Sequence, residues 1–358
     1  MSSGPFLTPG QAARRRAAAV RRRRRRLAAG VTALVLLIAG AVYALSGKGP
    51  GPDRARSAAA PAPAAAPARR PLSQTGLPLA APALKLTGLT GASSDPIRLT
   101  LHHPPAAGLL FNVTTGQVLW QLRPERRLRI ASLTKLMTAL IAVESSPPRA
   151  PVLGTRQAVD ANGSKVGELP LGRRVAMESM LYGLLLPSGN DAAIAIAQHV
   201  SGTVPAFVQR MNREAARLGL GCTRFSSPSG YYNHGNYSCA ADLAVLAHVD
   251  LAQPRIARIT STYQAILPFP IKGGRLYLYN NNPLLIYGYP GTTGLKTGYT
   301  IEAGRCLIGT AERDGVRLGA VILNSTEPGN QVRRLLDRGF RDVYHLPAVP
   351  EQPFPPGA

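Results

Sequence analysis

Three short motifs constrain this chain more than any other feature. They are Ser132-Leu-Thr-Lys135, Ser188-Gly-Asn190 and Lys296-Thr-Gly298. Ser132 and Ser188 are 56 residues apart, and a further 108 residues separate Ser188 from Lys296. Each motif alone arises by chance in many chains. In this order they supply a nucleophile, a base, a proton carrier and a basic strand, which favours a fold that gathers them for acyl transfer.

The first motif places a serine and a lysine on one face of a helix. The apolar run 133–144 has helical spacing, and positions i and i+3 of a helix lie side by side. A serine hydroxyl needs a base to remove its proton. Lys135 is such a base only when neutral, which requires burial or a nearby cation such as Lys296. Taken alone, Ser132 is more simply explained as a helix N-cap, and the other two motifs favour catalysis.

The second motif occupies an expected loop. Ser188-Gly-Asn190 follows Pro187 and precedes an apolar helical pattern that begins at Asp191. A serine presented by a loop can pass a proton to a leaving amine. Asn190 both donates and accepts hydrogen bonds, so it can hold a substrate amide or Lys135. An N-terminal turn of the next helix explains Ser188 equally well by itself.

The third motif reads as part of a strand. In a regular strand Lys296 and Gly298 face one side and Thr297 the other. Glycine lets a ligand backbone approach closely, and the lysine and threonine side chains can bind a carboxylate. Taken alone, the motif is explained by a solvent-facing lysine on a sheet edge.

The N-terminal region predicts a membrane anchor. The arginine run 21–26 precedes the uncharged apolar stretch 27–45, which is long enough to cross about 30 Å of hydrocarbon. Arginines before such a span hold that end in the cytoplasm. We therefore expect a cytoplasmic tail at 1–26, a single transmembrane helix at 27–45, and a catalytic domain outside the cell membrane. Cleavage of a signal peptide after Ala44, followed by secretion, is the alternative.

The rest of the chain divides by composition. Residues 46–104 are rich in Pro, Ala and Gly and predict a linker, 105–345 predict the folded domain, and 346–358 a Pro-rich tail. The net charge of +24 favours anionic partners. The arginine run also resembles a nucleic-acid patch, but the apolar span beside it favours an anchor, so no nucleic acid is expected.

The order of expected elements predicts an α+β fold. Strands at both ends and helices between them favour an antiparallel sheet covered by helices, with a helical subdomain. The expected helices are 133–144, 177–186, 191–200, 204–218, 239–248 and 331–344, and the expected strands are 109–113, 117–121, 276–280, 294–298, 305–310 and 316–323.

The three cysteines predict one disulfide. Cys222 and Cys239 are 17 residues apart in a polar, loop-rich stretch, and the expected compartment permits oxidation, so we expect them to pair. Cys306 falls in an apolar strand pattern and is expected to be a buried free thiol. The spacings match no common metal motif, so no metal is expected.

With these motifs in place, the chain resembles the serine D-alanyl-D-alanine carboxypeptidases of peptidase family S11, the low-molecular-mass penicillin-binding proteins. The resemblance covers about residues 104–345 and extends to Leu184–Ala193, Phe225–Gly230, Asn280–Leu285 and Gly294–Thr300. It implies a β-lactamase/transpeptidase-like fold. It also implies peptidoglycan stem peptides as substrates, β-lactam antibiotics as acylating inhibitors, and no cofactor.

The resemblance implies a role for each motif. Ser132 would be acylated by the penultimate D-Ala with release of the terminal one, and Lys135 would be the general base. Ser188, Asn190 and Lys296 would complete the proton network. Thr297 and Gly298 would bind the substrate, and the backbone N–H groups of Ser132 and Tyr299 would form an oxyanion hole.

Several alternatives remain open at this point. A class A β-lactamase shares the motif order, but the Glu-x-x-Leu-Asn motif of that class has no match, and the nearby Glu214 lies in a helical pattern. A D,D-endopeptidase that cuts cross-links differs only in the shape of its groove. A non-catalytic wall-binding protein is disfavoured by the complete motifs. Some relatives carry a second domain and a C-terminal amphipathic anchor, a role that the N-terminal span is expected to take here.

Overall fold

A computed structural model describes residues 84–89, 95–231, 234–350 and 353–355. All of these belong to the second of two compact units, residues 68–358. The expected cytoplasmic tail, transmembrane helix and first part of the linker lie outside the described residues. Among the residues that are described, no helix is both long and apolar enough to span a membrane.

A five-stranded sheet forms the centre of the domain. Its strands are β1 (Ala107–Asn112), β2 (Val118–Leu122), β7 (Thr292–Thr300), β8 (Gly304–Arg313) and β9 (Val316–Ser325). They run in the order β2-β1-β9-β8-β7, and every neighbouring pair is antiparallel. The antiparallel α+β arrangement expected from the sequence is therefore confirmed. Strand β7 is an edge of this sheet within the described residues. The segment Ala131–Thr134, which contains Ser132, packs against this strand.

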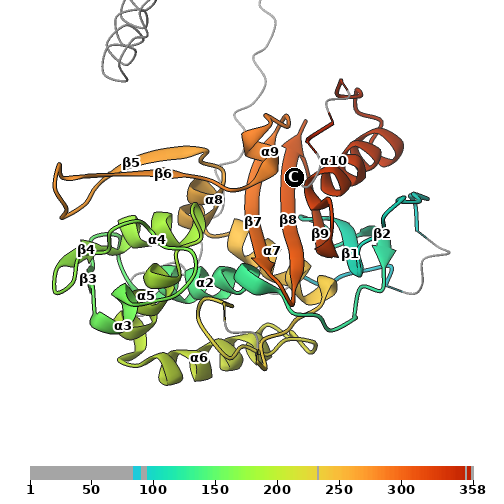
Figure 1. Ribbon diagram of the computed structural model, residues 1–358. Helices are drawn as coiled ribbons and strands as arrows, with labels where there is room; N and C mark the ends of the chain where they lie inside the picture. The colour runs from blue at the N-terminus through green and yellow to red at the C-terminus, as the bar shows by residue number, and fades with distance from the viewer. Residues whose placement is uncertain (1–83, 90–94, 232–233, 351–352, 356–358) are drawn as a thin grey trace, which may run out of the picture. The chain divides into compact units, whose positions relative to one another are not determined.

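Helices cover both faces of the sheet (Figure 1). One face carries α10 (Pro328–Arg338), which continues into a π-helical turn at Gly339–Val343. The other face carries α7 (Ala240–Leu251), α8 (Pro254–Thr260) and, further out, α2 (Lys135–Ser145). This layering follows from the strand sequences, which place apolar side chains on both faces.

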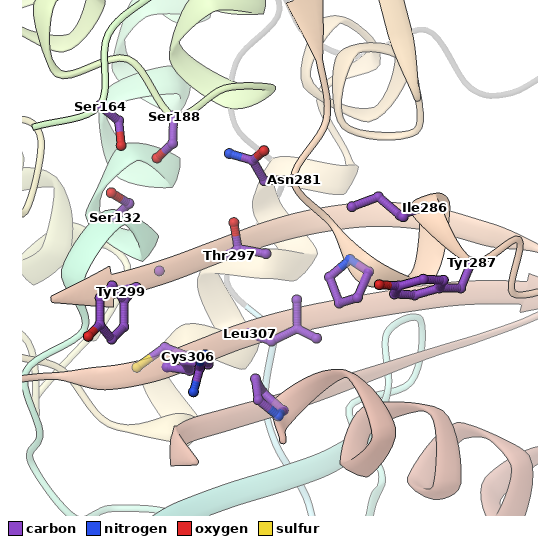
Figure 2. A pocket seen from close by; sticks show the side chains of 14 residues that line it. Ser132, Ser164, Ser188, Asn281, Ile286, Tyr287, Thr297, Tyr299, Cys306 and Leu307 are labelled. Atoms are coloured by element: carbon purple, nitrogen blue, oxygen red, sulfur yellow. The ribbon is translucent and has the colours of Figure 1, made fainter. Parts of the chain in front are cut away.

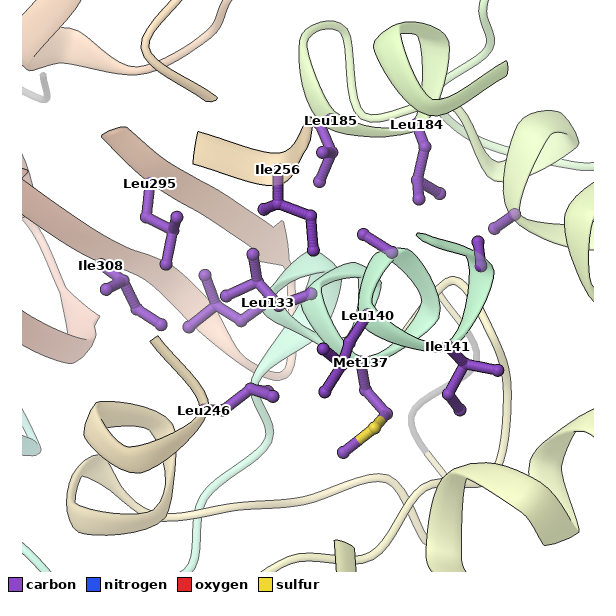
Figure 3. Packing of buried hydrophobic residues seen from close by; sticks show 14 of the residues in the cluster. Leu133, Met137, Leu140, Ile141, Leu184, Leu185, Leu246, Ile256, Leu295 and Ile308 are labelled. Carbon is purple, nitrogen blue, oxygen red and sulfur yellow. The ribbon is translucent and has the colours of Figure 1, made fainter. Parts of the chain in front are cut away.

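A helical subdomain packs beside the sheet. It contains α3 (Arg156–Val159), α4 (Met177–Leu185), α5 (Asn190–Ser201) and α6 (Val204–Arg217), with a short ribbon of β3 (Pro151–Leu153) and β4 (Arg174–Ala176). Helix α2 is buried along most of its length and lies at the centre of the core. Figure 3 shows Leu133, Met137 and Leu140 among side chains from the sheet and from α4, α7 and α8.

One predicted strand does not join the main sheet. The strand expected at 276–280 is β6 (Arg275–Tyr279), and it pairs with β5 (Gln264–Pro268) in a separate ribbon. Three side chains of β6 are exposed, so it lacks the two apolar faces that a central strand of this sheet needs. The ribbon leads directly into α9 (Pro283–Ile286), which lies beside β7.

Residues outside the predicted 105–345 domain also pack onto the sheet. The described part of the linker is irregular, as expected, but Ile97 is buried and the Asp95 carboxylate accepts hydrogen bonds from Gln121 N–H at 2.9 Å and Nε2 at 2.7 Å. In the C-terminal tail, Phe354 is buried. Both segments therefore contribute to the folded domain.

The cysteines are arranged as the sequence predicts. Cys222 and Cys239 form a disulfide, and Cys306 is a buried free thiol. Burial raises the pKa of the Cys306 thiol to about 12, so this sulfur is a poor nucleophile. Among the described residues, one group of possible metal ligands occurs, Cys222, Cys239 and Asp242. Its two sulfurs are already joined to each other.

Candidate active site

The fold brings the three motifs together from separate parts of the chain, and Lys135 is the first residue of α2. Ser132 lies in a 3₁₀ turn, Ala131–Thr134, that leads into α2 and packs against β7. Ser188 lies in the loop between α4 and α5, and Asn190 is the first residue of α5. Lys296, Thr297 and Gly298 lie on the edge strand β7.

Lys135 connects the first two motifs through hydrogen bonds. Its Nζ atom lies 2.8 Å from Oγ of Ser132, 2.7 Å from Oδ1 of Asn190 and 2.9 Å from the carbonyl oxygen of Ser229. The amide and carbonyl oxygens only accept, so a neutral amine gives both its N–H groups to them. Its lone pair is then left for the Ser132 hydroxyl, which is the arrangement a general base requires.

The surroundings of Lys135 favour its neutral form. Burial holds the pKa of Lys135 well below its usual value, the charge of Lys296 lowers it further, and Asp191 opposes the shift. Lys296 is buried as well, and burial lowers its pKa to about 7. The sequence suggested Lys296 as a nearby cation that could keep Lys135 neutral, and the effect of the Lys296 charge on the pKa of Lys135 is consistent with that suggestion.

Ser188 has a hydroxyl that is buried and without a hydrogen-bond partner in the described part of the chain. In Figure 2 it points toward the same space as the hydroxyls of Ser132 and Ser164. Since a buried hydroxyl normally has a partner, this one is available to a substrate or to a proton in transit. The position agrees with the role that the second motif predicts.

A cavity of about 360 Å³ extends from these serines along β7. Thr297, Gly298 and Tyr299 form part of its lining, and Ile286 and Tyr287 lie toward the end away from Ser132 (Figure 2). None of its described lining residues is acidic. Glu214, the residue considered for β-lactam hydrolysis, instead pairs with Arg217 on α6.

A second cavity, of about 520 Å³, lies on the other side of Ser132. Ser132, Ser164 and Tyr299 line both cavities, whereas Asn190 and Arg129 line the second cavity and not the first. Ser132 therefore lies between two cavities, with open space on both sides of its hydroxyl.

Gly298 brings β7 close to Ser132. A Cβ atom at this position would lie 2.8 Å from the carbonyl oxygen of Ile130 and 3.2 Å from the backbone nitrogen of Ser132. Only glycine permits this approach without displacing one of the two segments. The sequence attributes Gly298 to substrate binding, and the structure adds this packing reason for a glycine here.

Two residues in the site adopt strained backbone conformations. Ala131, directly before Ser132, has a φ of 47°, and Ser188 has a φ of 67°. Residues other than glycine rarely adopt such angles, and those that do cluster at functional sites. The strain therefore marks the same two segments as the motifs.

Several site residues were not predicted from the motifs. The Ser229 carbonyl reaches Lys135, and Asn162 accepts a hydrogen bond of 2.7 Å from Nδ2 of Asn190, which fixes the amide orientation. Ser164 lines both cavities. The family resemblance at Phe225–Gly230 includes Ser229, but nothing in that stretch indicates that the Ser229 carbonyl oxygen meets Lys135.

The chain is similar to known D-alanyl-D-alanine peptidases. The family model of the D-alanyl-D-alanine carboxypeptidases, peptidase family S11, matches residues 100–327. The D-alanyl-D-alanine carboxypeptidase DacF of Bacillus subtilis is 35% identical over 67% of this chain and 63% of its own length, so the chain spans just under two thirds of that relative. The D-alanyl-D-alanine endopeptidase of Pseudomonas aeruginosa is 32% identical over 74% of this chain and 89% of its own.

The fold is also similar to a solved structure. The crystal structure of the Streptomyces K15 DD-transpeptidase aligns with a TM-score of 0.64 and 29% identity, covering 68% of this chain and 99% of that one. The family match, the relatives and the fold agree with the geometry of the three motifs. The chain belongs to the peptidase S11 family of D-alanyl-D-alanine carboxypeptidases.

Proposed function

We propose that this protein removes the terminal D-Ala from peptidoglycan stem pentapeptides through an acyl-enzyme on Ser132. The contacts of Lys135 carry this proposal, because they leave its lone pair directed to the Ser132 hydroxyl. Similarity to carboxypeptidases supports the substrate class.

Acylation begins with proton transfer from Ser132 to neutral Lys135. The serine oxygen attacks the carbonyl carbon of the penultimate D-Ala, and the developing oxyanion is stabilised by the backbone N–H groups of Ser132 and Tyr299. Both residues line the cavity, and the start of a helical turn leaves N–H groups without helical partners. The Thr297 hydroxyl and the Lys296 charge bind the terminal carboxylate.

Collapse of the tetrahedral intermediate breaks the bond between carbon and nitrogen. The leaving amine takes a proton that originates on Lys135 and passes through the Ser188 hydroxyl, so D-alanine departs neutral at its nitrogen. Water then attacks the ester, Lys135 accepts its proton, and the Ser132 oxygen recovers a proton as the peptide leaves. A β-lactam acylates the same serine, and its opened ring keeps the leaving nitrogen attached.

D-Alanine release by the full chain tests this function. We expect release from a pentapeptide ending in D-Ala-D-Ala, and none from the matched peptide ending in D-Ala-L-Ala. Absence of release from both, together with normal acylation by a penicillin, would contradict the carboxypeptidase assignment.

A D,D-endopeptidase is the second candidate, because one similar relative bears that name. Cross-linked stem dimers given to the same preparation distinguish the two. Cleavage of dimers at a higher kcat/KM than the pentapeptide would assign the protein as an endopeptidase.

We also propose a cell-membrane location, with a single span at 27–45, the N-terminus in the cytoplasm and the catalytic domain outside. The uncharged stretch after the arginine run supports it. A full chain that fractionates with membranes, and whose domain is digested by protease added outside intact cells, is the expected result. A soluble mature form beginning after Ala44 would show that the segment is a cleaved signal instead.

A further inference from the structure

One residue, Tyr287, lies between the far end of the catalytic cavity and another cavity. Tyr287, directly after α9, lines the 360 Å³ cavity that contains Ser132. It also lines a separate cavity of about 210 Å³, together with Val349, Pro350 and Phe354 of the C-terminal tail. The Tyr287 side chain therefore separates the catalytic groove from a space that the tail closes.

Phe354 supports Tyr287 from the side away from the groove. The two rings lie 4.9 Å apart at their centroids, with their planes tilted by 31°. The Phe354 side chain is only 5% exposed, whereas Tyr287 is 39% exposed. Aromatic rings at this separation attract each other beyond the effect of burial, so Phe354 restricts where the Tyr287 ring can move.

Phe354 is itself held by specific hydrogen bonds to α10. Its backbone N–H donates to Oδ1 of Asn330 at 2.9 Å, and its carbonyl oxygen accepts from Nδ2 of Asn330 at 3.0 Å. Earlier in the tail, the Leu346 N–H donates to the Phe340 carbonyl oxygen at 2.9 Å, and the Arg313 guanidinium donates to the Pro347 carbonyl oxygen. The tail is thus fixed to the domain at several described points.

The position of Tyr287 bears on the size of the group that leaves. In the proposed reaction the terminal carboxylate binds at Thr297, which places the departing residue between Ser132 and Tyr287 (Figure 2). A carboxypeptidase releases a single amino acid, whereas an endopeptidase releases a whole second stem. The wall at Tyr287 limits how far a leaving group extends along β7.

We propose that Phe354 of the C-terminal tail is a specificity-determining positioning residue, which holds Tyr287 so that the cavity favours a single leaving residue over a second stem. This inference rests on the proposed function, because it assumes that the leaving group occupies the Tyr287 side of Ser132. Phe354 does not contact the substrate and acts only through Tyr287.

The first test compares Phe354→Ala with the native full chain on two substrates. The quantity compared is kcat/KM for a cross-linked stem dimer divided by kcat/KM for the pentapeptide. In the variant we expect this ratio to rise about tenfold, the size of effect that loss of an apolar group from a binding pocket has on discrimination between substrates. The pentapeptide KM rises while kcat stays within about twofold, because the catalytic groups are unchanged. Phe354→Tyr keeps the ring and restores the native ratio.

A matched control separates this role from general stability. Phe269 is also a buried phenylalanine, but it packs in the core cluster around α2, whereas Phe354 belongs to the cluster around α10. Phe269 lines neither of the two cavities that Tyr287 borders. Phe269→Ala is expected to lower the melting temperature without changing the substrate ratio. If Phe354→Ala lowers the melting temperature and leaves the ratio at the native value, Phe354 is merely structural and the inference is wrong.

A second readout does not depend on the natural substrate. Cephalosporins with a small or a large substituent on the ring side opposite the acyl chain test the same end of the cavity through acylation of Ser132. In Phe354→Ala, the acylation rate with the large-substituent cephalosporin should rise relative to the rate with the small-substituent one. If the alanine variant does not fold, Phe354→Leu replaces it in this test. An unchanged ratio overturns the inference. Failure of D-alanine release with a changed cephalosporin ratio would instead contradict only the proposed function.

Discussion

The Nζ atom of Lys135 lies 2.7 Å from Oδ1 of Asn190, across 55 residues of sequence. This hydrogen bond joins Lys135 of the first motif directly to Asn190 of the second motif. Asn190 is fixed in turn by its own hydrogen bond to the Asn162 carbonyl oxygen. The Lys135 amine, the proposed base, is therefore oriented by a buried polar network, and changes in that network are expected to alter the pH dependence of acylation.

Lys296→Met should move the acylation pH profile to higher pH. Acylation needs neutral Lys135, so its rate rises as pH passes upward through the lowered pKa of Lys135. The Lys296 charge is one cause of that lowering. Removing it raises the Lys135 pKa, and each unit costs about tenfold in rate on the acidic limb. The effect is largest below the Lys296 pKa of about 7.

Acylation by a fluorescent penicillin between pH 5.5 and 9 measures this shift. Lys272→Met, which removes an exposed lysine in the β5–β6 turn, is the control and should leave the profile unchanged. An acidic limb at its native position in Lys296→Met would show that Lys296 does not act on Lys135.

Gly298→Ala should block catalysis without unfolding the protein. The added methyl group would meet the Ile130 carbonyl oxygen and the Ser132 nitrogen, so β7 must move away from the nucleophile. Loss of one oxyanion donor typically lowers the rate by about 10²- to 10³-fold, and we expect a decrease of that size. Gly221→Ala meets no atom within 4 Å and is the control. Native acylation rates in Gly298→Ala would contradict the assigned geometry.

Asp250→Asn should stabilise the protein at neutral and alkaline pH. The Asp250 side chain is fully buried, and neither carboxylate oxygen has a partner among the described residues. Burial, with the nearby Glu144 charge, raises its pKa well above the usual value. The folded state thus favours the protonated form, and stability falls as pH rises through that raised pKa.

Denaturant unfolding at pH 5 and pH 8 tests this prediction. The amide carries no charge at either pH, so the variant should gain about 1 to 3 kcal/mol over the native protein at pH 8 and less at pH 5. An equal effect at both values would show that the ionised carboxylate is not the cause.

Replacing both disulfide cysteines by serine should lower stability and spare the chemistry. The Cys222–Cys239 bond closes a loop of 17 residues, for which chain entropy predicts a loss of about 3 kcal/mol. Thermal unfolding of Cys222→Ser/Cys239→Ser, with penicillin acylation measured below the transition, checks both points. A native midpoint would mean that the bond adds nothing to the free energy of unfolding.

Local patterns predicted the longer helices of the domain. The helix expected at 191–200 is α5, and the one expected at 204–218 is α6, which Gly219 follows with a φ of 73°. The last helix, expected at 331–344, instead begins at Pro328, a residue well suited to a first turn, and gives way to the π-helical turn after Arg338.

Contacts between segments that are distant in the sequence could not be predicted from local patterns. The pairing of β5 with β6, the Ser229 carbonyl at Lys135 and the burial of Phe354 all depend on tertiary packing rather than on local periodicity. The motifs predicted which residue types meet at the site. The tail beside Tyr287 could not be foreseen, because its Pro-rich composition is equally typical of a segment without a docking site.

Peptide mapping of a trapped acyl-enzyme tests the central claim most directly. After exposure of the native full chain to a penicillin, mass spectrometry should place the added mass on Ser132, and the Ser132→Ala variant should acquire none while keeping a cooperative melt near the native temperature. Its rate of D-alanine release should also fall at least about a thousandfold. Acylation at another residue, or undiminished acylation of Ser132→Ala, would contradict Ser132 as the nucleophile.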